Sequence, residues 1–367
     1  MTGLSLFANI GIAEAYLNKL GFDIVVANEL DPRRAAIYQS IYPATNMICG
    51  DITDKVIYKS IIEASKKAHV DFILATPPCQ GMSTAGKLDK NDIRNILFQH
   101  AVDAILELSP QYFMFENVPA FMTTTIKNGD DETLIPDLIR RSLESKYHLE
   151  FNIVNTQNYG VPQSRERMIL LGTKMGIKKV WTMPVPSSEL VTMKDAIGDL
   201  PSLDPYVRDI SEEEFKQLFP HFEEKKSQAL NISPWHSPPI HIYSNVVAMQ
   251  HTPTGCSAFQ NCDQYKPRKK NGQLEKGFGN TYKRQKWDTP AYTIAMSNNQ
   301  ISTQNSVHPG RKIGTDKDGV AIYSDARVLT IYELMRLMSI PHDWPVPLTT
   351  NKQFLRHIIG EGVPSLF

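Results

Sequence analysis

Short apolar runs alternate with longer amphipathic stretches over residues 1 to about 175, and this alternation restricts the chain to few folds. The runs have the length of strands, and the stretches repeat on the 3.6-residue period of a helix. The expected strands are residues 4–7, 23–28, 70–75, 112–115, 148–154 and 168–172, and the expected helices are residues 11–20, 32–42, 54–68, 95–108 and 134–145. This order predicts an α/β fold, a Rossmann-like, doubly wound and mostly parallel sheet with helices on both faces. Such sheets bind ligands beyond the carboxyl ends of their strands, so the site is expected on one rim.

From about residue 174 the character of the sequence changes. Residues 184–309 hold 12 of the 24 prolines and few long helical periods, which is typical of a smaller, loop-rich domain. Helical patterns return after residue 325, first over residues 331–338 and then over residues 341–347. We therefore expect a first domain over residues 1–180, a second over residues 181–324, and a C-terminal segment, 325–367, that returns to the first domain.

The charge balance limits how a polyanion could bind. Thirty-nine basic residues offset 39 acidic ones among 367, so a polyanionic partner must meet a local patch rather than the whole surface. One such patch is Gln264–Lys286, hereafter the basic segment, where eight Lys or Arg residues accompany Glu275 alone and Tyr265, Phe278 and Tyr282 lie between the charges. The segment is either a solvated loop or a surface that contacts phosphates.

Cysteine and histidine usage indicates neither a disulfide framework nor a metal site. The four cysteines are scattered without a C-x-x-C spacing, and His236, His241, His251 and Cys256 match no standard metal motif. No apolar stretch has the length of a membrane span, and the N-terminus lacks a signal peptide pattern. These features predict a soluble, unsecreted protein of a reducing cytoplasm, without a metal.

Residues with reactive side chains lie at the ends of three of the expected strands. Cys79 lies in a tight turn after residues 70–75, Glu116 follows residues 112–115, and Arg165 and Arg167 precede residues 168–172. A thiol exposed at a strand-to-loop turn can act as a nucleophile, whereas a lone cysteine is more often a small buried apolar residue. The convergence of a thiol, a carboxylate and two guanidiniums on one sheet edge favours the nucleophile.

Eight short motifs are spread over almost the whole chain: Phe7-Ala8-Asn9-Ile10-Gly11, Asn28-Glu29-Leu30-Asp31, Gly50-Asp51-Ile52, Pro78-Cys79-Gln80, Glu116-Asn117-Val118, Gln163-Ser164-Arg165-Glu166-Arg167, Arg327-Val328-Leu329-Thr330 with Glu333, and Gly360-Glu361-Gly362-Val363-Pro364. Together they resemble, in the same order, the motifs of the bacterial DNA cytosine C5-methyltransferases of restriction-modification systems.

The resemblance implies a role for each reactive residue. Cys79 adds to carbon 6 of cytosine, Glu116 delivers a proton to N3, and Arg165 and Arg167 bind the base O2 and orient Glu116. Methyl transfer from S-adenosylmethionine to carbon 5 follows, after which the carbon 5 proton leaves and Cys79 is eliminated. Because a duplex buries carbon 6, the cytosine must first be flipped out of the stack.

The same resemblance implies S-adenosylmethionine as the cofactor. Glu29 is expected to accept hydrogen bonds from the ribose, Asp51 to face the adenine amino group, and Ile52 to pack on the ring. Acidic residues at two strand ends, with no basic residue in the first turn, favour this cofactor over a dinucleotide. The full expected set is Phe7, Asn9, Ile10, Gly11, Glu29, Asp51, Ile52, Pro78, Leu97 and Val363.

The expected partner is double-stranded DNA, in the nucleoid-associated cytoplasm of a bacterium, with a cognate restriction endonuclease as functional partner. Residues 81–94 are expected to form a lid. The expected DNA contacts are Gln80, Ser83, Arg268, Lys269, Lys270, Lys283 and Arg284. The chain ends three residues after Pro364, where relatives continue into a helix, so a second polypeptide that supplies this helix is a further hypothesis.

Three alternatives remain open from the sequence. The nearest is a tRNA cytosine-5 methyltransferase of the same fold, although residues 174–324 are long enough for a DNA recognition domain. A non-catalytic DNA-binding protein would have no reason to keep Cys79, Glu116 and both arginines. A nicotinamide oxidoreductase is disfavoured by the glycine-poor first turn.

Overall fold

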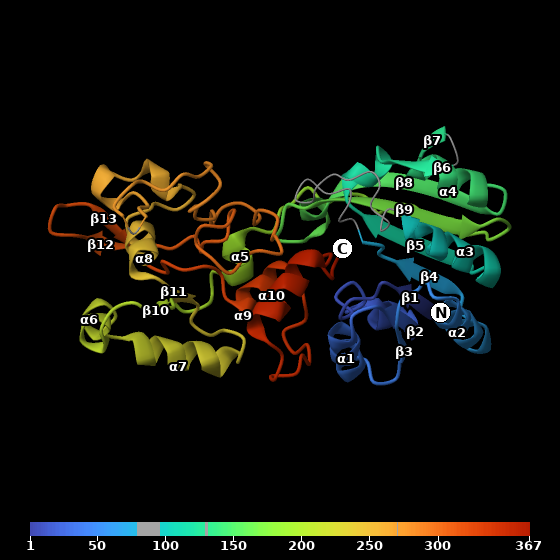
Figure 1. Ribbon diagram of the computed structural model, residues 1–367, viewed down its shortest axis with the longest axis horizontal. Coiled ribbons are helices and arrows are strands. Elements are labelled where there is room, and N and C mark those ends of the chain that lie inside the picture. The colour runs from blue at the N-terminus through green and yellow to red at the C-terminus, as the bar shows by residue number, and fades with distance from the viewer. Residues whose placement is uncertain (79–95, 129–130, 270) are drawn as a thin grey trace. The chain divides into compact units, whose positions relative to one another are not determined.

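The computed structural model describes residues 1–78, 96–128, 131–269 and 271–367, which form two compact units (Figure 1). The first unit comprises Met1–Tyr159, Glu166–Ser187 and Trp344–Pro347, and the second comprises Gly160–Arg165, Ser188–Asp343 and Leu348–Phe367. The C-terminal segment therefore differs from the expected return to the first domain, since only Trp344–Pro347 groups there. Its two helices instead pack against each other within the second unit.

The first unit is built on a seven-stranded sheet in the order β3-β2-β1-β4-β5-β9-β8 (Figure 1). The strands are β1 (Thr2–Leu6), β2 (Asp23–Glu29), β3 (Asn46–Cys49), β4 (Phe72–Ala75), β5 (Tyr112–Asn117), β8 (Tyr147–Asn155) and β9 (Glu166–Lys174). Pairing is parallel from β3 to β5, and β9 is antiparallel to both of its neighbours. The predicted doubly wound, mostly parallel sheet is confirmed. The strand order reverses between β1 and β4, which is where ligands bind in such sheets.

Four helices of the first unit lie close to their expected positions. They are α1 (Pro32–Ile41), α2 (Lys55–Lys67), α3 (Phe98–Leu108) and α4 (Ile135–Leu143). Local chemistry sets two of the starts, because the Asp31 and Asp54 carboxylates accept backbone N–H bonds in the first turns of α1 and α2. Pro32 also occupies the first turn of α1, where its missing N–H costs nothing.

The helix expected over residues 11–20 is wrong, since only Leu17–Leu20 forms a short 3-10 helix. Gly11 has φ 82°, and the N–H groups of Glu14, Ala15 and Leu17 bond three residues back rather than four. The buried Glu14 carboxylate binds the hydroxyl groups of Ser5, at 2.5 Å, and Tyr38. These contacts hold the segment in successive turns, although its apolar spacing suits a helix.

Each face of the sheet has its own apolar core. In β4, Ile73 and Ala75 join the cluster beneath α2, α3 and α4, whereas Phe72 and Leu74 pack on the opposite face with Trp181. This alternation follows from the two-residue period of a strand. Burial on both faces explains why the central strands read as continuous apolar runs.

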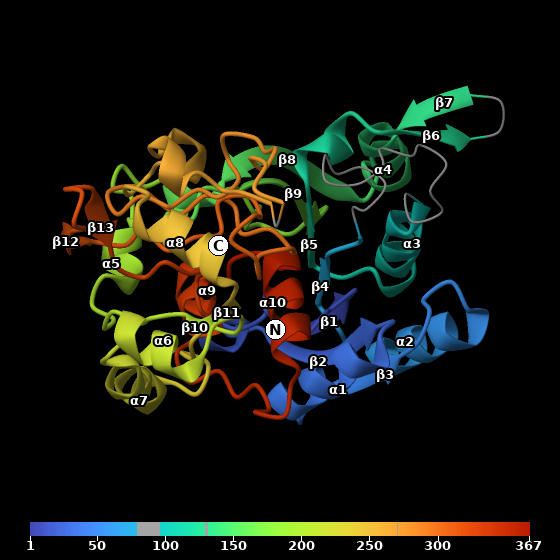
Figure 2. The same cartoon turned by 60° about the vertical axis from the view of Figure 1, so that its left-hand side comes forward.

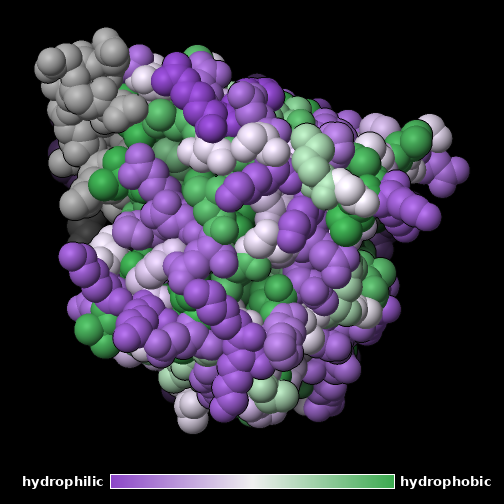
Figure 3. All heavy atoms as spheres, turned by 90° about the vertical axis from the view of Figure 1, so that its right-hand side faces the viewer, coloured by the Kyte–Doolittle hydropathy of each residue, from purple (hydrophilic) through white to green (hydrophobic). Residues whose placement is uncertain are grey.

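A two-stranded hairpin of β6 (Thr125–Asn128) and β7 (Asp131–Leu134) extends from the first unit between β5 and α4 (Figure 2). The face shown in Figure 3 is mostly hydrophilic, with hydrophobic residues in small groups between the polar ones. Within the described residues, no helix combines the length and apolar character needed to cross a bilayer.

The second unit combines short helices, small sheets and long connections (Figure 1). Its helices are α5 (Met193–Ile197), α6 (Glu212–Leu218), α7 (Phe222–Ile232), α8 (Tyr243–Gln250), α9 (Ile331–Leu337) and α10 (Lys352–Glu361), and its strand pairs are β10 (Tyr206–Val207) with β11 (Ile240–His241) and β12 (Lys312–Thr315) with β13 (Ala321–Tyr323). The helix expected over residues 341–347 is wrong. Three prolines interrupt that stretch, and the last helix, α10, begins later, after Asn351 caps its first turn.

A buried ionic network holds the centre of the second unit. The Arg327 guanidinium is fully buried and binds Asp325 Oδ1 at 2.9 Å and both Glu333 oxygens at 2.8 Å. Burial raises the pKa of the Glu333 carboxyl, but the charge and hydrogen bonds of Arg327 lower it further, and the resulting pKa is about 2. Thr330 and Glu333 also form the capping box that begins α9. The motif formed by residues 327–330 and Glu333 therefore stabilises the interior of the second unit.

Two buried histidines make the second unit sensitive to acid. Burial lowers the pKa of His241 to about 3 and that of His308 to about 4, whereas both regain the ordinary value near 6.5 on unfolding. Because the unfolded state binds the extra protons, the stabilisation is fully present above pH ~6.5 and declines as the pH falls.

We predict that urea unfolding of the second unit will show a free energy lower by about 2–3 kcal/mol at pH ~5.5 than at pH ~7.5, from these two groups. A His308→Asn variant should lose about half of this difference, and a variant of the exposed His148 should keep all of it. An equal free energy at the two pH values would show that the buried histidines do not control acid stability.

Candidate active site

Glu116 and Arg167 form a close ion pair at the rim of the sheet. Glu116 is the next-to-last residue of β5, Arg167 is the second residue of β9, and these strands pair antiparallel beside each other. The Arg167 Nε atom lies 2.6 Å from Glu116 Oε1, and the two side chains are only 10% and 14% exposed. A charge-assisted bond of this length in a shielded position fixes the direction of the carboxyl group. The expected orienting role is thus supported by geometry for Arg167.

Cys79, Gln80, Ser83 and the expected lid, residues 81–94, lie outside the described residues, but the stem that leads to Cys79 is described. The stem is anchored on both sides. Thr76 donates its N–H to the Leu6 carbonyl at 3.2 Å and its hydroxyl to the Phe7 carbonyl at 3.1 Å. On the other side, the Asn117 amide donates to the Pro77 carbonyl at 3.0 Å.

Asn117 is a positioning residue for which we expected no role. Its side chain is 3% exposed, its Nδ2 holds the stem before Cys79, and its Oδ1 accepts the N–H of Val118. It thereby ties the segment before Cys79 to the strand that carries Glu116. The available signal was its place directly after Glu116 at a strand end, where a buried amide must find partners.

Arg165 differs from the expectation that both arginines orient Glu116. Its guanidinium is buried in the second unit, where it donates to the Ile294 carbonyl at 2.9 Å and to the Gly360 carbonyl at 3.0 Å. It thus links the arginine motif to the closing motif at the end of α10. Residues two apart on a strand share a face, but Arg165 precedes β9, which begins at Glu166, so the strand period does not set the direction of its side chain.

The turn after β1 has an unusual backbone conformation and packs closely against α1 and the residue that follows it. Phe7, Asn9 and Gly11 all have positive φ, and a Cβ on Gly11 would lie 2.2 Å from the Tyr42 ring. The Tyr42 hydroxyl donates to the Gly11 carbonyl at 2.7 Å. Glycine at this position is therefore required by both conformation and space. Among the other expected contacts, Ile10 is fully buried beneath the turn.

Acidic residues stand at the carboxyl ends of β2 and β3, as expected. Glu29 is 6% exposed, and its oxygens accept the N–H groups of Asn9 and Asp31, each at 2.9 Å. Each carboxylate oxygen has a second lone pair, so Glu29 can shape the first turn and still accept a ribose hydroxyl. Asp51 is exposed and accepts the Thr53 N–H at 2.9 Å.

The remaining expected cofactor contacts fall into three environments. Ile52 is only 4% exposed and belongs to the main core, so little of it remains for packing on an adenine ring. Leu97 and Pro78 are half-buried in the first unit. Val363 is half-buried in the second unit. The turn and the two carboxylates fit an adenosyl group without phosphates, because no basic side chain lies in the Phe7–Gly11 turn.

The basic segment is divided by burial. Arg268 and Lys269 are exposed, Lys283 is half-buried over the Tyr292 ring, and Lys270 lies outside the described residues. Arg284, in contrast, is fully buried and donates to four backbone carbonyls, those of Met249, His308, Ser324 and Asp325. Our expectation that Arg284 contacts DNA is therefore wrong in this structure, because its charge stabilises the interior of the second unit.

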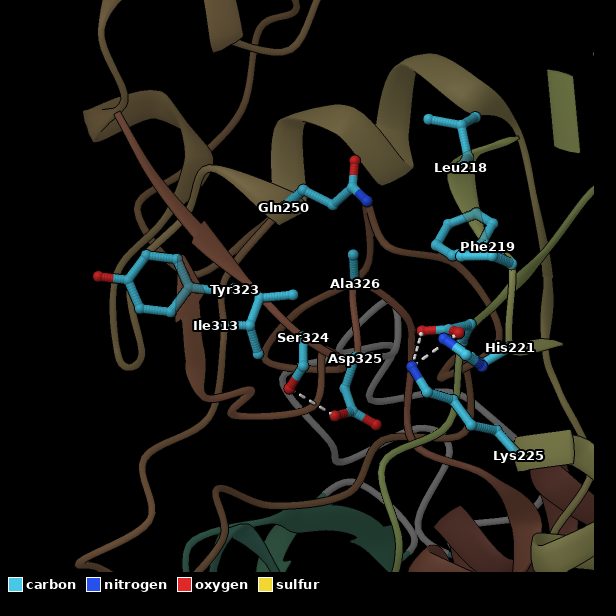
Figure 4. A pocket seen from close by; sticks show the side chains of 12 residues that line it. Leu218, Phe219, His221, Lys225, Gln250, Ile313, Tyr323, Ser324, Asp325 and Ala326 are labelled. Atoms are coloured by element: carbon cyan, nitrogen blue, oxygen red, sulfur yellow. Dashed lines mark hydrogen bonds and ion pairs between the residues drawn. The ribbon is translucent and has the colours of Figure 1, made fainter. Parts of the chain in front are cut away.

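A pocket of about 210 Å³ lies in the second unit between α6, α8 and β13 (Figure 4). Four of its polar residues pair with one another, since Lys225 binds both Asp204 oxygens at 2.9 and 3.0 Å and Ser324 donates to Asp325 at 2.7 Å. Asp325 also belongs to the Arg327 network. The pocket is thus the outer margin of a structural cluster.

Comparisons with known proteins agree with the site. The family model of C-5 cytosine-specific DNA methylases matches residues 1–366. The type II methyltransferase M1.HgaI of Avibacterium volantium is 40% identical over 369 residues, covering 99% of this chain and 95% of that protein. The type II methyltransferase M.XorII of Xanthomonas oryzae pv. oryzae is 32% identical over 209 residues, covering 56% of this chain and 47% of that protein.

Two solved structures share the fold. A putative DNA modification methyltransferase encoded within an E. coli prophage has a TM-score of 0.64 at 20% identity, over 100% of this chain and 95% of that one. A mutant of Spodoptera frugiperda DNMT2 has a TM-score of 0.58 at 17% identity, over 100% and 96% of the two chains. With the family match over residues 1–366 and the Glu116–Arg167 rim, the chain belongs to the C-5 cytosine-specific DNA methylases and is a DNA (cytosine-5) methyltransferase.

Proposed function

We propose that this chain is the modification enzyme of a type II restriction-modification system and methylates carbon 5 of a cytosine in duplex DNA through a covalent Cys79 adduct. The observation that carries the proposal is the shielded Glu116–Arg167 pair beside the anchored stem of the Cys79 loop. The similarity to M1.HgaI over nearly the full length of both proteins supports the biological setting, in which a cognate endonuclease cleaves unmodified DNA.

The division of labour follows from the weak nucleophilicity of carbon 5. Addition of the Cys79 thiolate at carbon 6 places negative charge in the ring, and Glu116 relieves it by giving a proton to N3. Arg167 holds one Glu116 oxygen, which leaves the other free to face the base. After methyl transfer a base removes the carbon 5 proton, and the electrons of that bond expel the Cys79 thiolate.

S-adenosylmethionine is the proposed methyl donor, and it supplies a methyl group on a good leaving group. The residues that would hold it are the Phe7–Gly11 turn, Glu29 and Asp51. All lie at the carboxyl ends of β1, β2 and β3, on the same edge as Glu116 and the Cys79 stem. Because a stacked cytosine cannot reach this edge, the proposal includes extrusion of the base from the duplex.

Bisulfite sequencing of a plasmid co-expressed with the protein tests this function. The expected result is that one cytosine within a fixed sequence context resists conversion. Complete conversion of the plasmid, with protected cytosine found in tRNA from the same cells, would contradict the DNA substrate and favour the tRNA alternative.

The exposed basic residues yield a prediction about salt. If Arg268 and Lys269 contact phosphates, changing both to Gln should weaken binding to all duplexes and make the slope of log affinity against log salt shallower by about one unit per lost contact. Fluorescence anisotropy measures both quantities. The matched control changes Lys59 and Lys67 of α2 to Gln, which removes the same charge from the first unit. An unchanged slope in the Arg268 and Lys269 variant would return the segment to a solvated loop.

A further inference from the structure

The structure separates the three aromatic residues of the basic segment. Tyr265 is stacked on His251 with ring centroids 3.5 Å apart, and its hydroxyl bonds Asp316 at 2.5 Å. Tyr282 is 7% exposed and belongs to the core of the second unit. Phe278 is 77% exposed, the most exposed aromatic side chain among the residues that the structure describes.

A packed turn supports the exposed Phe278 ring. The Phe278 carbonyl accepts both the N–H and the hydroxyl of Thr281, at 2.9 and 2.8 Å. On one side, a Cβ at Gly277 would lie 2.6 Å from the Phe259 ring, so the backbone there is in close contact with the unit. On the other side, a Cβ at Gly279 would meet nothing within 4 Å. The base of the turn is thus fixed, whereas its tip projects into open space.

The surroundings of Phe278 restrict what could cover it. Lys276 is two residues away and exposed, Lys269 is exposed in the same segment, and the exposed Arg268 is paired with Asp263 at 2.9 Å. Burial of a Phe side chain is favourable, so this exposed ring forgoes most of that stabilisation in the free protein. A partner that gains from the ring must also accept the positive charges that Lys269 and Lys276 carry in the same segment. Duplex DNA offers phosphates for the cations and flat bases for the ring.

We propose that Phe278 inserts into the base stack of the bound duplex as an aromatic wedge, an inference that rests on the proposed DNA substrate. Inserted apolar side chains unstack a base step, and protein–phosphate contacts offset the cost. Extrusion of a cytosine removes stacking from its neighbours, and an aromatic ring in the stack replaces part of that loss. The fixed turn reduces the entropy lost when the ring is ordered on DNA.

The first test compares how tightly Phe278 variants bind an unmodified duplex that contains the sequence that the enzyme methylates. Phe278→Ala should bind roughly 5- to 100-fold more weakly, with an unchanged salt slope because no charge is lost. Phe278→Trp should bind within about twofold of the parent, since its ring also stacks. The control is Tyr243→Ala, which removes a 40% exposed aromatic ring of the second unit outside the basic segment. Equal affinity of Phe278→Ala and the parent would overturn the proposal.

The second test locates the ring on the DNA. With 2-aminopurine placed at successive positions, the parent should raise the fluorescence at one step, and Phe278→Ala should not. The same fluorescence profile for both proteins would overturn the proposal. It would also be overturned if Phe278→Ala lost self-association while its DNA affinity stayed unchanged. Failure of the proposed function would be distinct, because the parent itself would then leave every plasmid cytosine open to bisulfite conversion.

Discussion

Replacing Glu116 with Gln is expected to lower the rate of methyl transfer by roughly 100-fold or more while DNA affinity stays the same. The amide keeps the shape of the side chain and can still accept the Arg167 Nε–H bond that measures 2.6 Å in the parent. It cannot release a proton to N3, and positioned proton transfer is usually worth at least about two orders of magnitude. Single-turnover methylation with labelled methyl donor measures the rate without interference from product release.

The matched control for this variant is Glu166→Gln. Glu166 is an exposed carboxylate next to Arg167 at the start of β9, so its change removes an equal charge from the same strand. The control should methylate at the parental rate. A Glu116→Gln rate within about tenfold of the parent would show that Glu116 is not the general acid.

The sheet was predictable because its signals are local and redundant. Continuous apolar runs mark β4 and β5, which are buried on both faces, and Asp31, Pro32 and Asp54 mark helix starts. The reactive residues follow from the same logic, because the carboxyl ends of neighbouring parallel strands share one edge. The pairing of Glu116 with Arg167 needed one further fact, the antiparallel placement of β9 beside β5.

The predictions failed where contacts between residues far apart in the sequence override the local sequence pattern. The run of charges around Arg284 gives no sign that its guanidinium is buried among carbonyls, since those acceptors come from residues 249, 308, 324 and 325. Likewise, the amphipathic spacing of residues 11–20 favours a helix, but the buried contacts of Glu14 hold turns there. The side chains of Arg165 and Arg167 separate for a similar reason, as their partners lie in different units.

Replacing Cys79 with Ala is expected to abolish methyl transfer. In the proposed mechanism the thiolate adds to carbon 6 and so activates carbon 5, and the proton from Glu116 assists that addition but cannot replace it. The variant should still bind duplex DNA with the salt slope of the parent, since the thiol contributes no phosphate contact. Cys49→Ala is the matched control, because that thiol is exposed at the end of β3 and has no assigned role. Methylation by Cys79→Ala at a rate near that of the parent would rule out covalent catalysis through this residue.

The most direct test of covalent catalysis uses a duplex with 5-fluorocytosine at the methylated position. The thiolate can add and the methyl group can be transferred, but fluorine cannot leave as a proton, so the enzyme should remain bonded to the DNA. The account predicts an adduct that survives denaturing electrophoresis, needs S-adenosylmethionine, maps to the peptide with Cys79, and is absent in Cys79→Ala. A crosslink through Cys49, Cys256 or Cys262, or no adduct while ordinary duplex is methylated efficiently, would contradict it.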